Sequence, residues 1–309
     1  MLGLANFVRA KVSAGPDLTA RRQVRGHSPG GDAQFGIDEV AEQAVWSYVT
    51  AQDLPMAVYS EDRGLRQHGR CPDYLLIVDP IDGTRPAAAG LEMATVSIAV
   101  ARLTTRPRLG DIEFGLVSEL KSGAFLYGEH DRPGVIAGGY DHDVPALSTT
   151  TELSRMYWSI EFNGHPAALM TAAYGHLIDA SANTGAVFVF SSASYSISRL
   201  ITGQLDAYVD IGNRLLRDDP GLLGEFQRVG NGHVLHLFPY DIAASVFLAE
   251  KAGVVITDAY GASLAETMLT DIGVDNQRSC VAASTPQLHR ELLDAIRWHP
   301  KPSSGSSRR

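Results

Sequence analysis

The strongest constraint on this chain is the run Tyr74-Leu-Leu-Ile-Val-Asp79-Pro80-Ile81-Asp82-Gly83-Thr84. An apolar segment of β-type residues leads into two carboxylates, a Pro and a Gly, and then a hydroxyl. Along a plain strand Asp79 and Asp82 would point to opposite faces, but a Pro at the strand exit and a Gly just after it bend the backbone. The sequence therefore predicts a buried strand whose end brings two carboxylates together, as a divalent metal site requires.

Backbone groups of the same run extend this interpretation. The Ile81 carbonyl, freed from strand pairing, is a candidate third oxygen. The amides of Gly83 and Thr84 are expected to face an anion, because a turn that enters a helix leaves N–H groups unpaired. Pro86 fits the first position of that helix. Asp-Pro and Asp-Gly are also ordinary turn dipeptides, so it is the full order that predicts a metal and phosphate site.

The order Asp79-Pro-Ile-Asp82-Gly-Thr84 closely resembles the signature of the inositol monophosphatase family, which consists of magnesium-dependent, lithium-sensitive phosphomonoesterases. Upstream, Met56-Ala-Val-Tyr-Ser60-Glu61-Asp62 is similar to the family's strand that ends in Gly-Glu-Glu. Asp38 opens an amphipathic stretch similar to the helix that precedes this strand in the family. The resemblance implies that Glu61 is a metal ligand and that Asp62 is the second acid of the motif.

Downstream, the segment from Tyr240-Asp241 to Gly253 resembles the family's second signature, which implies that Asp241 is a metal ligand. The piece Ser191-Ser192-Ala193-Ser194 resembles the start of the family's Gly-Ser-Ala-Ala helix. The strand after that helix ends at Asp210, in the position where family members contact substrate hydroxyls. The resemblance covers roughly residues 34 to 298.

The resemblance also implies a mechanism in which a metal-activated water attacks the phosphate. Thr84 would hydrogen-bond that water, with Asp38 behind it as proton acceptor, and Asp82 would also be catalytic. An all-oxygen ligand set favours two or three Mg²⁺ ions, with Mn²⁺ as a possible substitute. The implied metal ligands are Glu61, Asp79, the Ile81 carbonyl, Asp82 and Asp241. The implied substrate contacts are Gly83, Thr84, Ser192, Ala193 and Asp210.

Several positions depart from the family pattern. Ser60, Pro86 and Ser191 replace the usual Gly, Asn and Gly, and segment 211–240 stands where the family has only a handful of residues. Arg214 or Arg217 in this insertion could close over a second anionic group, although an ordinary solvent-facing helix is the simpler alternative. The first long helix of the family is poorly represented in residues 1 to 30, so we expect a shortened or rebuilt element there.

The expected fold is a mixed α/β (α+β) layered α-β-α-β-α sandwich of the inositol monophosphatase and fructose-1,6-bisphosphatase type. We expect one catalytic domain over 1–299, with halves of about 30–145 and 146–299 joined by a crossover near 140–155. Residues 300–309 are expected to be a disordered tail. Hydrophobic patterning predicts strands near 56–60, 74–79, 94–102, 111–118, 124–128, 156–161, 186–190, 206–210, 253–257 and 279–283. It predicts helices near 38–51, 165–176, 192–202, 240–251 and 286–298.

Composition and charge exclude other classes of protein. A net charge of −9 disfavours a nucleic-acid partner, and no apolar run is long enough for a membrane span, so we expect a cytoplasmic protein without a signal peptide. Cys71 and Cys280 suggest neither a disulfide framework nor a zinc site. The spacing of His233 and His236 could suggest a metal pair, but a strand there would point the two rings to opposite faces. A homodimer is implied by the family alone.

The predicted activity is metal-dependent hydrolysis of a phosphate monoester of a small polyol or sugar. Alternatives within the same fold are a 3′-phosphoadenosine 5′-phosphate phosphatase and a fructose-1,6-bisphosphate phosphatase, the latter needing extra basic residues for its second phosphate. A noncatalytic phosphate-binding member of the family is a third alternative. Ser192 as a hydrolase nucleophile is disfavoured because no Gly-x-Ser-x-Gly motif is present, and we expect it to cap a helix.

Overall fold

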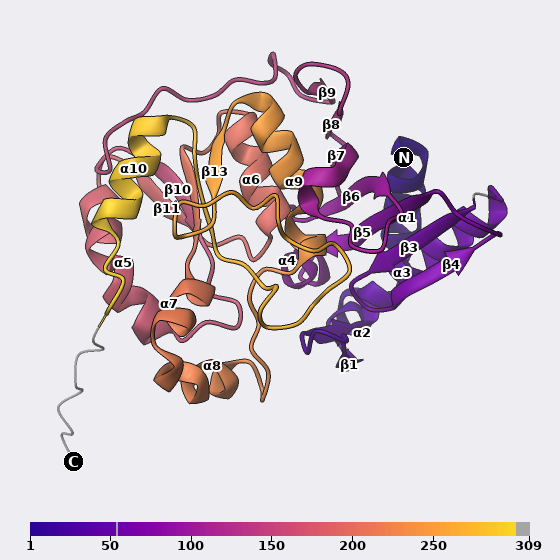
Figure 1. Ribbon diagram of the computed structural model, residues 1–309, viewed down its shortest axis with the longest axis horizontal. Coiled ribbons are helices and arrows are strands. Elements are labelled where there is room, and N and C mark those ends of the chain that lie inside the picture. The colour runs from indigo at the N-terminus through magenta and orange to yellow at the C-terminus, as the bar shows by residue number, and fades with distance from the viewer. Residues whose placement is uncertain (54, 301–309) are drawn as a thin grey trace.

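The structure is a computed structural model, which describes residues 1–53 and 55–300. Its two main sheets lie within a layered arrangement of helices (Figure 1). The larger sheet has seven strands in the order β4-β3-β5-β6-β7-β8-β9, and the smaller has five in the order β11-β10-β12-β14-β13. Strands β1 and β2 form a separate two-stranded sheet.

The strands are β1 (Val24–His27), β2 (Ala33–Phe35), β3 (Met56–Ser60), β4 (Gly64–His68), β5 (Tyr74–Asp82), β6 (Thr95–Arg102), β7 (Ile112–Glu119), β8 (Phe125–Glu129), β9 (Ile136–Gly138), β10 (Tyr157–Ile160), β11 (Ala186–Phe188), β12 (Ala207–Asp210), β13 (Val255–Thr257) and β14 (Cys280–Ala283). The α-helices are α1 (Leu2–Ser13), α2 (Leu18–Arg21), α3 (Gly36–Ala51), α4 (Thr84–Ala88), α5 (Ala167–Ser181), α6 (Ala193–Ile201), α7 (Gly212–Asp218), α8 (Leu223–Val229), α9 (Pro239–Ala252) and α10 (Pro286–Ala295). Short 3₁₀ helices are η1 (Leu109–Asp111) and η2 (Pro220–Leu222).

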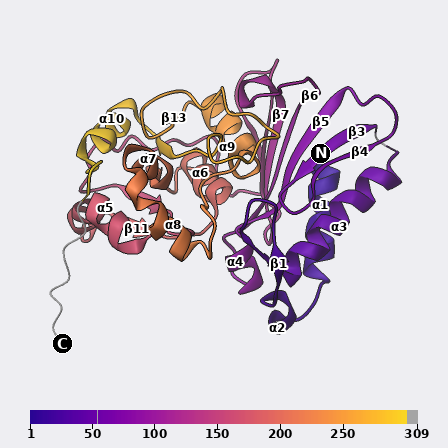
Figure 2. The same ribbon diagram turned by 60° about the horizontal axis from the view of Figure 1, so that its bottom comes forward.

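The apolar run of β5 is buried on both faces of the large sheet. Leu76 and Val78 pack with α1 and α3, whereas Leu75 and Ile77 face the core that contains α6 and α9. Figure 2 shows α1 and α3 on one side of this sheet and α6 and α9 on the other. A strand with two covered faces needs apolar residues at every position, which explains why this segment does not alternate.

The small sheet completes the layers. One of its faces, which includes Tyr208 and Cys280, joins the core around α6 and α9. Its other face, with Trp158 and Val281, packs against α5 and α10. The order is therefore helices, sheet, helices, sheet, helices, and the predicted layered sandwich is confirmed.

Most predicted elements are present, and β6, β7 and β8 pair antiparallel as expected. The expectation for the N-terminus is wrong in part, because α1 is a regular helix whose buried residues Leu4, Val8 and Val12 pack on the large sheet. These three positions recur at helical spacing, which is the sequence signal for such a helix.

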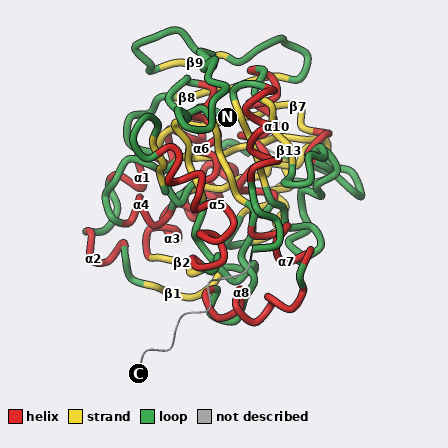
Figure 3. Tube along the Cα trace, turned by 90° about the vertical axis from the view of Figure 1, so that its left-hand side faces the viewer, coloured by secondary structure: helices red, strands yellow, loops and turns green. Residues whose placement is uncertain are grey.

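No helix or strand interrupts the described chain between β9 and β10, where the crossover between halves was expected. Figure 3 shows long loops beside β9 at the top of the molecule. Of the expected tail, residues 301–309 lie outside the described residues. Among the residues described, no helix is long and apolar enough to cross a membrane.

Candidate active site

The two carboxylates of β5 converge at a bulge in the sheet. Asp79 pairs with Ser97 of β6 and Asp82 pairs with Thr95, and the register shifts between them. The extra residue in β5 turns both side chains to the same side. One carboxylate oxygen from each, together with one from Asp241, forms a group whose members all lie within 4.8 Å of one another. The convergence predicted for Asp79 and Asp82 is confirmed, and we call these three residues the carboxylate triad.

Asp241 reaches the triad from the start of α9. It is the third residue of this helix, and its Oδ2 accepts a hydrogen bond from the Phe238 amide at 2.7 Å. Its backbone carbonyl accepts a hydrogen bond from the Ser194 hydroxyl at 2.7 Å. The position of Asp241 is thus tied to the first turns of both α9 and α6.

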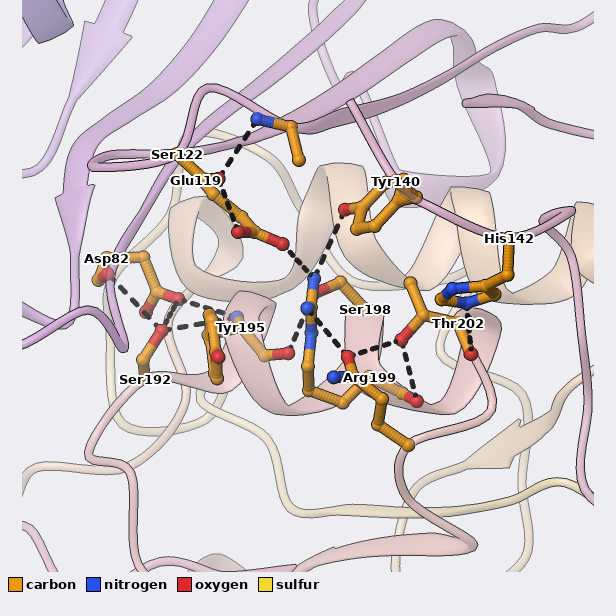
Figure 4. A network of polar contacts seen from close by, with 12 residues as sticks. Asp82, Glu119, Ser122, Tyr140, His142, Ser192, Tyr195, Ser198, Arg199 and Thr202 are labelled. Atoms are coloured by element: carbon orange, nitrogen blue, oxygen red, sulfur yellow. Dashed lines mark hydrogen bonds and ion pairs between the residues drawn. The ribbon is translucent and has the colours of Figure 1, made fainter. Parts of the chain in front are cut away.

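Asp82 is held by the N-terminus of α6 (Figure 4). Its carboxylate accepts hydrogen bonds from the amides of Ser194 at 2.7 Å and of Ala193 and Tyr195 at 3.3 Å, and from the Ser192 hydroxyl. Ser192 also accepts from the Tyr195 amide, so its expected role as helix cap is confirmed. Burial raises the pKa of Asp82 and these hydrogen bonds lower it, and the net result is a pKa of about 6.

The triad fits a hard divalent cation. Burial and the charges of neighbouring carboxylates raise the pKa values of Asp79 and Asp241 well above the ordinary range, and the same two causes act on Glu61. Such carboxylates repel one another until a cation or protons neutralise them. Glu61 lines the same cavity but lies outside the triad, and the Ile81 backbone contributes to the lining as well.

Glu42 explains the unexpected Ser60 beside Glu61. The Ser60 hydroxyl donates to one Glu42 oxygen at 2.8 Å, and the Asp62 amide donates to the other at 3.2 Å. Glu42 is buried in α3 and therefore holds the backbone on both sides of Glu61. A glycine at position 60 would lack the first of these bonds.

Thr84 and Asp38 form the hydrogen-bonded pair expected from the sequence. The Thr84 hydroxyl lies 3.0 Å from Asp38 Oδ1 and 3.1 Å from the Ile81 carbonyl oxygen, so it can donate to either. Asp38 is 7% exposed, lies behind Thr84, and accepts the Phe35 amide at 2.8 Å through its other oxygen. Burial raises the pKa of Asp38 to about 7.

The turn after Asp82 requires a glycine. Gly83 has φ of 91°, and a Cβ at this position would lie 2.6 Å from the Met93 carbonyl oxygen. Gly83 and Thr84 both line the cavity. The expectation for Pro86 is wrong, because α4 begins at Thr84 and Pro86 is its third residue.

Asp210 lies at the end of β12, where it lines the cavity together with Glu161. Glu161 follows β10, which runs parallel to β12, so both carboxylates leave the sheet at the same edge. Burial raises the pKa of Asp210 to about 7 and also raises the pKa of Glu161. Sequence reasoning missed Glu161, although its place at the end of a predicted strand was a usable signal.

The start of the insertion 211–240 forms helix α7, so the simpler alternative of an ordinary helix at Arg214 and Arg217 is confirmed. Arg214 stacks on Trp298 and Arg217 donates to the Asp275 carbonyl, and neither lines the cavity. The strand expected around His233 and His236 is wrong, since only Leu237 makes an isolated bridge. His236 instead lines the cavity, as does His165 from the loop before α5.

The cavity has a volume of about 80 Å³. Among the described residues that line it, Arg85 is the only Arg or Lys, and its guanidinium forms an ion pair with Asp32 at 2.8 Å. The Asn163 amide lies 3.4 Å from the same carboxylate. All the predicted site residues line this cavity except Asp38.

Known proteins resemble the chain along most of its length. A fructose-1,6-bisphosphatase/inositol-1-monophosphatase of Archaeoglobus fulgidus is 25% identical over 294 residues, with 95% of each chain covered. A bifunctional NADP phosphatase/NAD kinase of Methanococcus maripaludis is 22% identical over 281 residues, which cover 87% of this chain and 44% of that protein. The crystal structure of the extragenic suppressor protein suhB from Bartonella henselae has a TM-score of 0.66 at 18% identity, with 96% of both chains covered.

A sequence model of the inositol monophosphatase family matches residues 8–301. Since this match includes both signature segments and every residue of the carboxylate triad, the chain belongs to the inositol monophosphatase family, whose members are metal-dependent phosphatases.

Proposed function

We propose that this phosphatase hydrolyses phosphate monoesters of small polyols or sugars with Mg²⁺ as its cofactor. The observation that carries the proposal is the presence, in one cavity, of the carboxylate triad and of Thr84, whose hydroxyl is bonded to Asp38. The carboxylate triad suits a hard cation, and the Thr84–Asp38 pair can orient a water molecule and accept its proton.

The residues that would hold Mg²⁺ are Asp79, Asp82 and Asp241, with Glu61 and the Ile81 carbonyl oxygen beside them. When bound, two or three ions would polarise the phosphate, activate a water and neutralise the leaving oxygen. The amides of α6 fix Asp82 before any ligand arrives, so little reorganisation is needed during the reaction.

Thr84 and Asp38 would manage the proton of the attacking water. In this role the Thr84 hydroxyl donates to Asp38 and accepts from the water. Asp38 accepts a proton best when it is ionised, which requires a pH above its raised pKa of about 7. The turn at Gly83 and Thr84 supplies backbone N–H groups for the phosphate oxygens.

The charge around the cavity favours a monophosphate over a bisphosphate. A second phosphate needs a cation, and Arg85 is already paired with Asp32. The named relatives nevertheless include a fructose-1,6-bisphosphatase and an NADP phosphatase, so these substrates belong in the test. A noncatalytic role is disfavoured because no proposed ligand or proton-handling residue has been lost.

The test is a phosphate-release assay with inositol 1-phosphate, fructose 1,6-bisphosphate, adenosine 3′,5′-bisphosphate and NADP. We expect the highest kcat/KM for inositol 1-phosphate, loss of activity in EDTA, and recovery with Mg²⁺ or partly with Mn²⁺. Inhibition by Li⁺ is expected from the family. Turnover that persists in EDTA would contradict the metal proposal, and a preference for either nucleotide would contradict the proposed substrate class.

A further inference from the structure

A cluster of buried polar atoms without partners lies in the cavity, outside the carboxylate triad. Its members are His165 Nε2, His236 Nε2 and Asp210 Oδ1, none of which has a hydrogen-bond partner within residues 1–53 and 55–300. The three residues are 3%, 5% and 2% exposed, respectively, and all line the cavity. We call them the histidine cluster.

Burial favours the neutral form of both imidazoles, because it lowers the pKa of His165 and lowers that of His236 well below its ordinary value. The Asn213 amide nitrogen can only donate, and it lies 3.2 Å from His236 Nδ1, so the proton of His236 is on Nε2. His165 Nδ1 faces the Glu161 carbonyl oxygen at 3.4 Å, which can only accept, so Nε2 of His165 is an acceptor. The cluster therefore offers one donor, at His236, and two acceptors, at His165 and Asp210.

The cluster does not satisfy itself. His165 Nε2 and Asp210 Oδ1 are 3.7 Å apart, which is too far for a hydrogen bond, and both are acceptors when the carboxylate is ionised. By contrast, the buried His289 in α10 lies 2.9 Å from the Thr257 hydroxyl through its Nε2. Unpartnered buried polar atoms destabilise a fold unless something else bonds to them. Their position in a cavity indicates a ligand.

Segment 211–240 completes this cluster. It contributes His236 and Asn213, and also Gly212, where a Cβ would lie 2.4 Å from His165 Nε2. A larger residue at position 212 would push the imidazole out of place. The insertion thus supplies one ring, orients it, and leaves room for the other.

We propose that the histidine cluster binds two adjacent hydroxyl groups of the leaving group, and that it thereby selects vicinal diols. One hydroxyl donates to Asp210 and the other to His165, and one of them accepts from His236. Hydroxyls both donate and accept, whereas an ammonium group only donates and would leave the His236 donor unpaired. This inference rests on the proposed phosphatase function and specifies the substrate at the same site.

The test compares inositol 1-phosphate with cyclohexyl phosphate, which has the same ring without the hydroxyls. The ratio of their kcat/KM values is measured for wild type, His236→Leu and Gly212→Ala, with His289→Leu as a matched variant of a buried histidine elsewhere. We expect the two cavity variants to lower this ratio at least tenfold and His289→Leu to leave the ratio within about twofold. Gly212→Ala keeps both histidines, so it tests the cluster even if His236→Leu folds poorly.

Two further measurements separate failure of this inference from failure of the proposed function. Equal losses on both phosphates in the cavity variants, or wild-type preference for 2-aminocyclohexyl phosphate over inositol 1-phosphate, would overturn the diol proposal while leaving phosphatase activity intact. If wild type hydrolyses neither phosphate, binding of free myo-inositol is followed by saturation-transfer NMR. A signal in wild type that is lost in His236→Leu supports the cluster without turnover, and an equal signal in both overturns it.

Discussion

Asp82 and Asp210 are both buried carboxylates in one cavity, yet the protein supplies hydrogen bonds to them to different extents. Asp82 accepts three amides and a hydroxyl from the first turn of α6. Asp210 leaves its Oδ1 without a partner among the residues described, beside an imidazole that also lacks one. Burial raises the pKa of both, but hydrogen bonds offset more of the effect at Asp82.

The difference lies in which hydrogen bonds the protein supplies itself and which it leaves open to a ligand. Around Asp82 the protein supplies the hydrogen bonds itself, which fixes the carboxylate for a cation. Around Asp210 one carboxylate oxygen, Oδ1, has no partner among the described residues and is available to a ligand. In the proposed function, the phosphate common to all candidate substrates would bind near Asp82, and the leaving group would be recognised near Asp210.

The largest expected effect is loss of turnover in Asp82→Asn, with similar losses in Asp79→Asn and Asp241→Asn. Each substitution removes a negative ligand from the proposed metal site, so phosphate release with Mg²⁺ should fall on the order of a hundredfold or more. Asp131→Asn, at an exposed loop position, serves as control. Near-normal turnover in the triad variants, with folding verified by circular dichroism, would remove the triad from the mechanism.

Thr84→Ala should lower kcat by roughly ten- to a hundredfold while KM stays within a few-fold, because its hydroxyl is assigned to the attacking water. Thr84→Ser keeps that hydroxyl and should recover most of the loss. Steady-state kinetics on inositol 1-phosphate distinguishes the roles. A collapse of affinity at normal kcat would make Thr84 a binding residue and refute its assignment.

Asp210→Ala should change substrate choice more than chemistry. We expect its kcat/KM on inositol 1-phosphate to fall roughly ten- to a hundredfold, and to fall less on fructose 1,6-bisphosphate and adenosine 3′,5′-bisphosphate. Arg217→Ala is the matched control in the insertion, because this side chain points to the Asp275 carbonyl and not into the cavity. Equal proportional losses on all three substrates in Asp210→Ala would show that Asp210 does not select the leaving group.

The smallest effect concerns stability without metal. The pKa values of Asp79, Asp82 and Asp241 are raised in the folded state. At a pH between the pKa values of the unfolded chain and those of the folded protein, the folded protein therefore binds more protons than the unfolded chain. The associated stability is present at low pH and is lost as pH rises through the folded-state pKa, which is about 6 for Asp82.

In EDTA we therefore expect Tm to fall by a few degrees between pH 5.5 and 7.5, and Mg²⁺ to raise Tm more at the higher pH. Asp79→Asn should flatten this dependence, since it removes one of the repelling charges. Differential scanning calorimetry provides the measurement. A Tm that is independent of both pH and Mg²⁺ would mean that the triad is not strained by its own charge.

Much of the fold was predictable from the sequence, because strands and helices that are buried in the core contain recognisable patterns of apolar residues. The apolar run of β5 and the patterns of α3, α6 and α9 were enough to indicate these elements. Helix α1 was not predicted, although its buried residues Leu4, Val8 and Val12 recur at helical spacing. The segment around His236 was interpreted as a strand from its apolar residues, although it pairs only through Leu237.

Sequence alone determined the carboxylates of β5 and the helix cap at Ser192, because each depends on residue order over a few positions. The family resemblance, and not local residue order, implied that Asp38 lies behind Thr84. Tertiary structure decided the bond network from α6 to Asp82, the bracket of Glu42 around Glu61, and the meeting of His165 with His236. These contacts join segments that are distant in sequence, and only the stacking of two sheets around α6 and α9 brings them together. Local sequence patterns do not predict which loops line the same cavity. The histidine cluster could therefore be identified only from the tertiary structure.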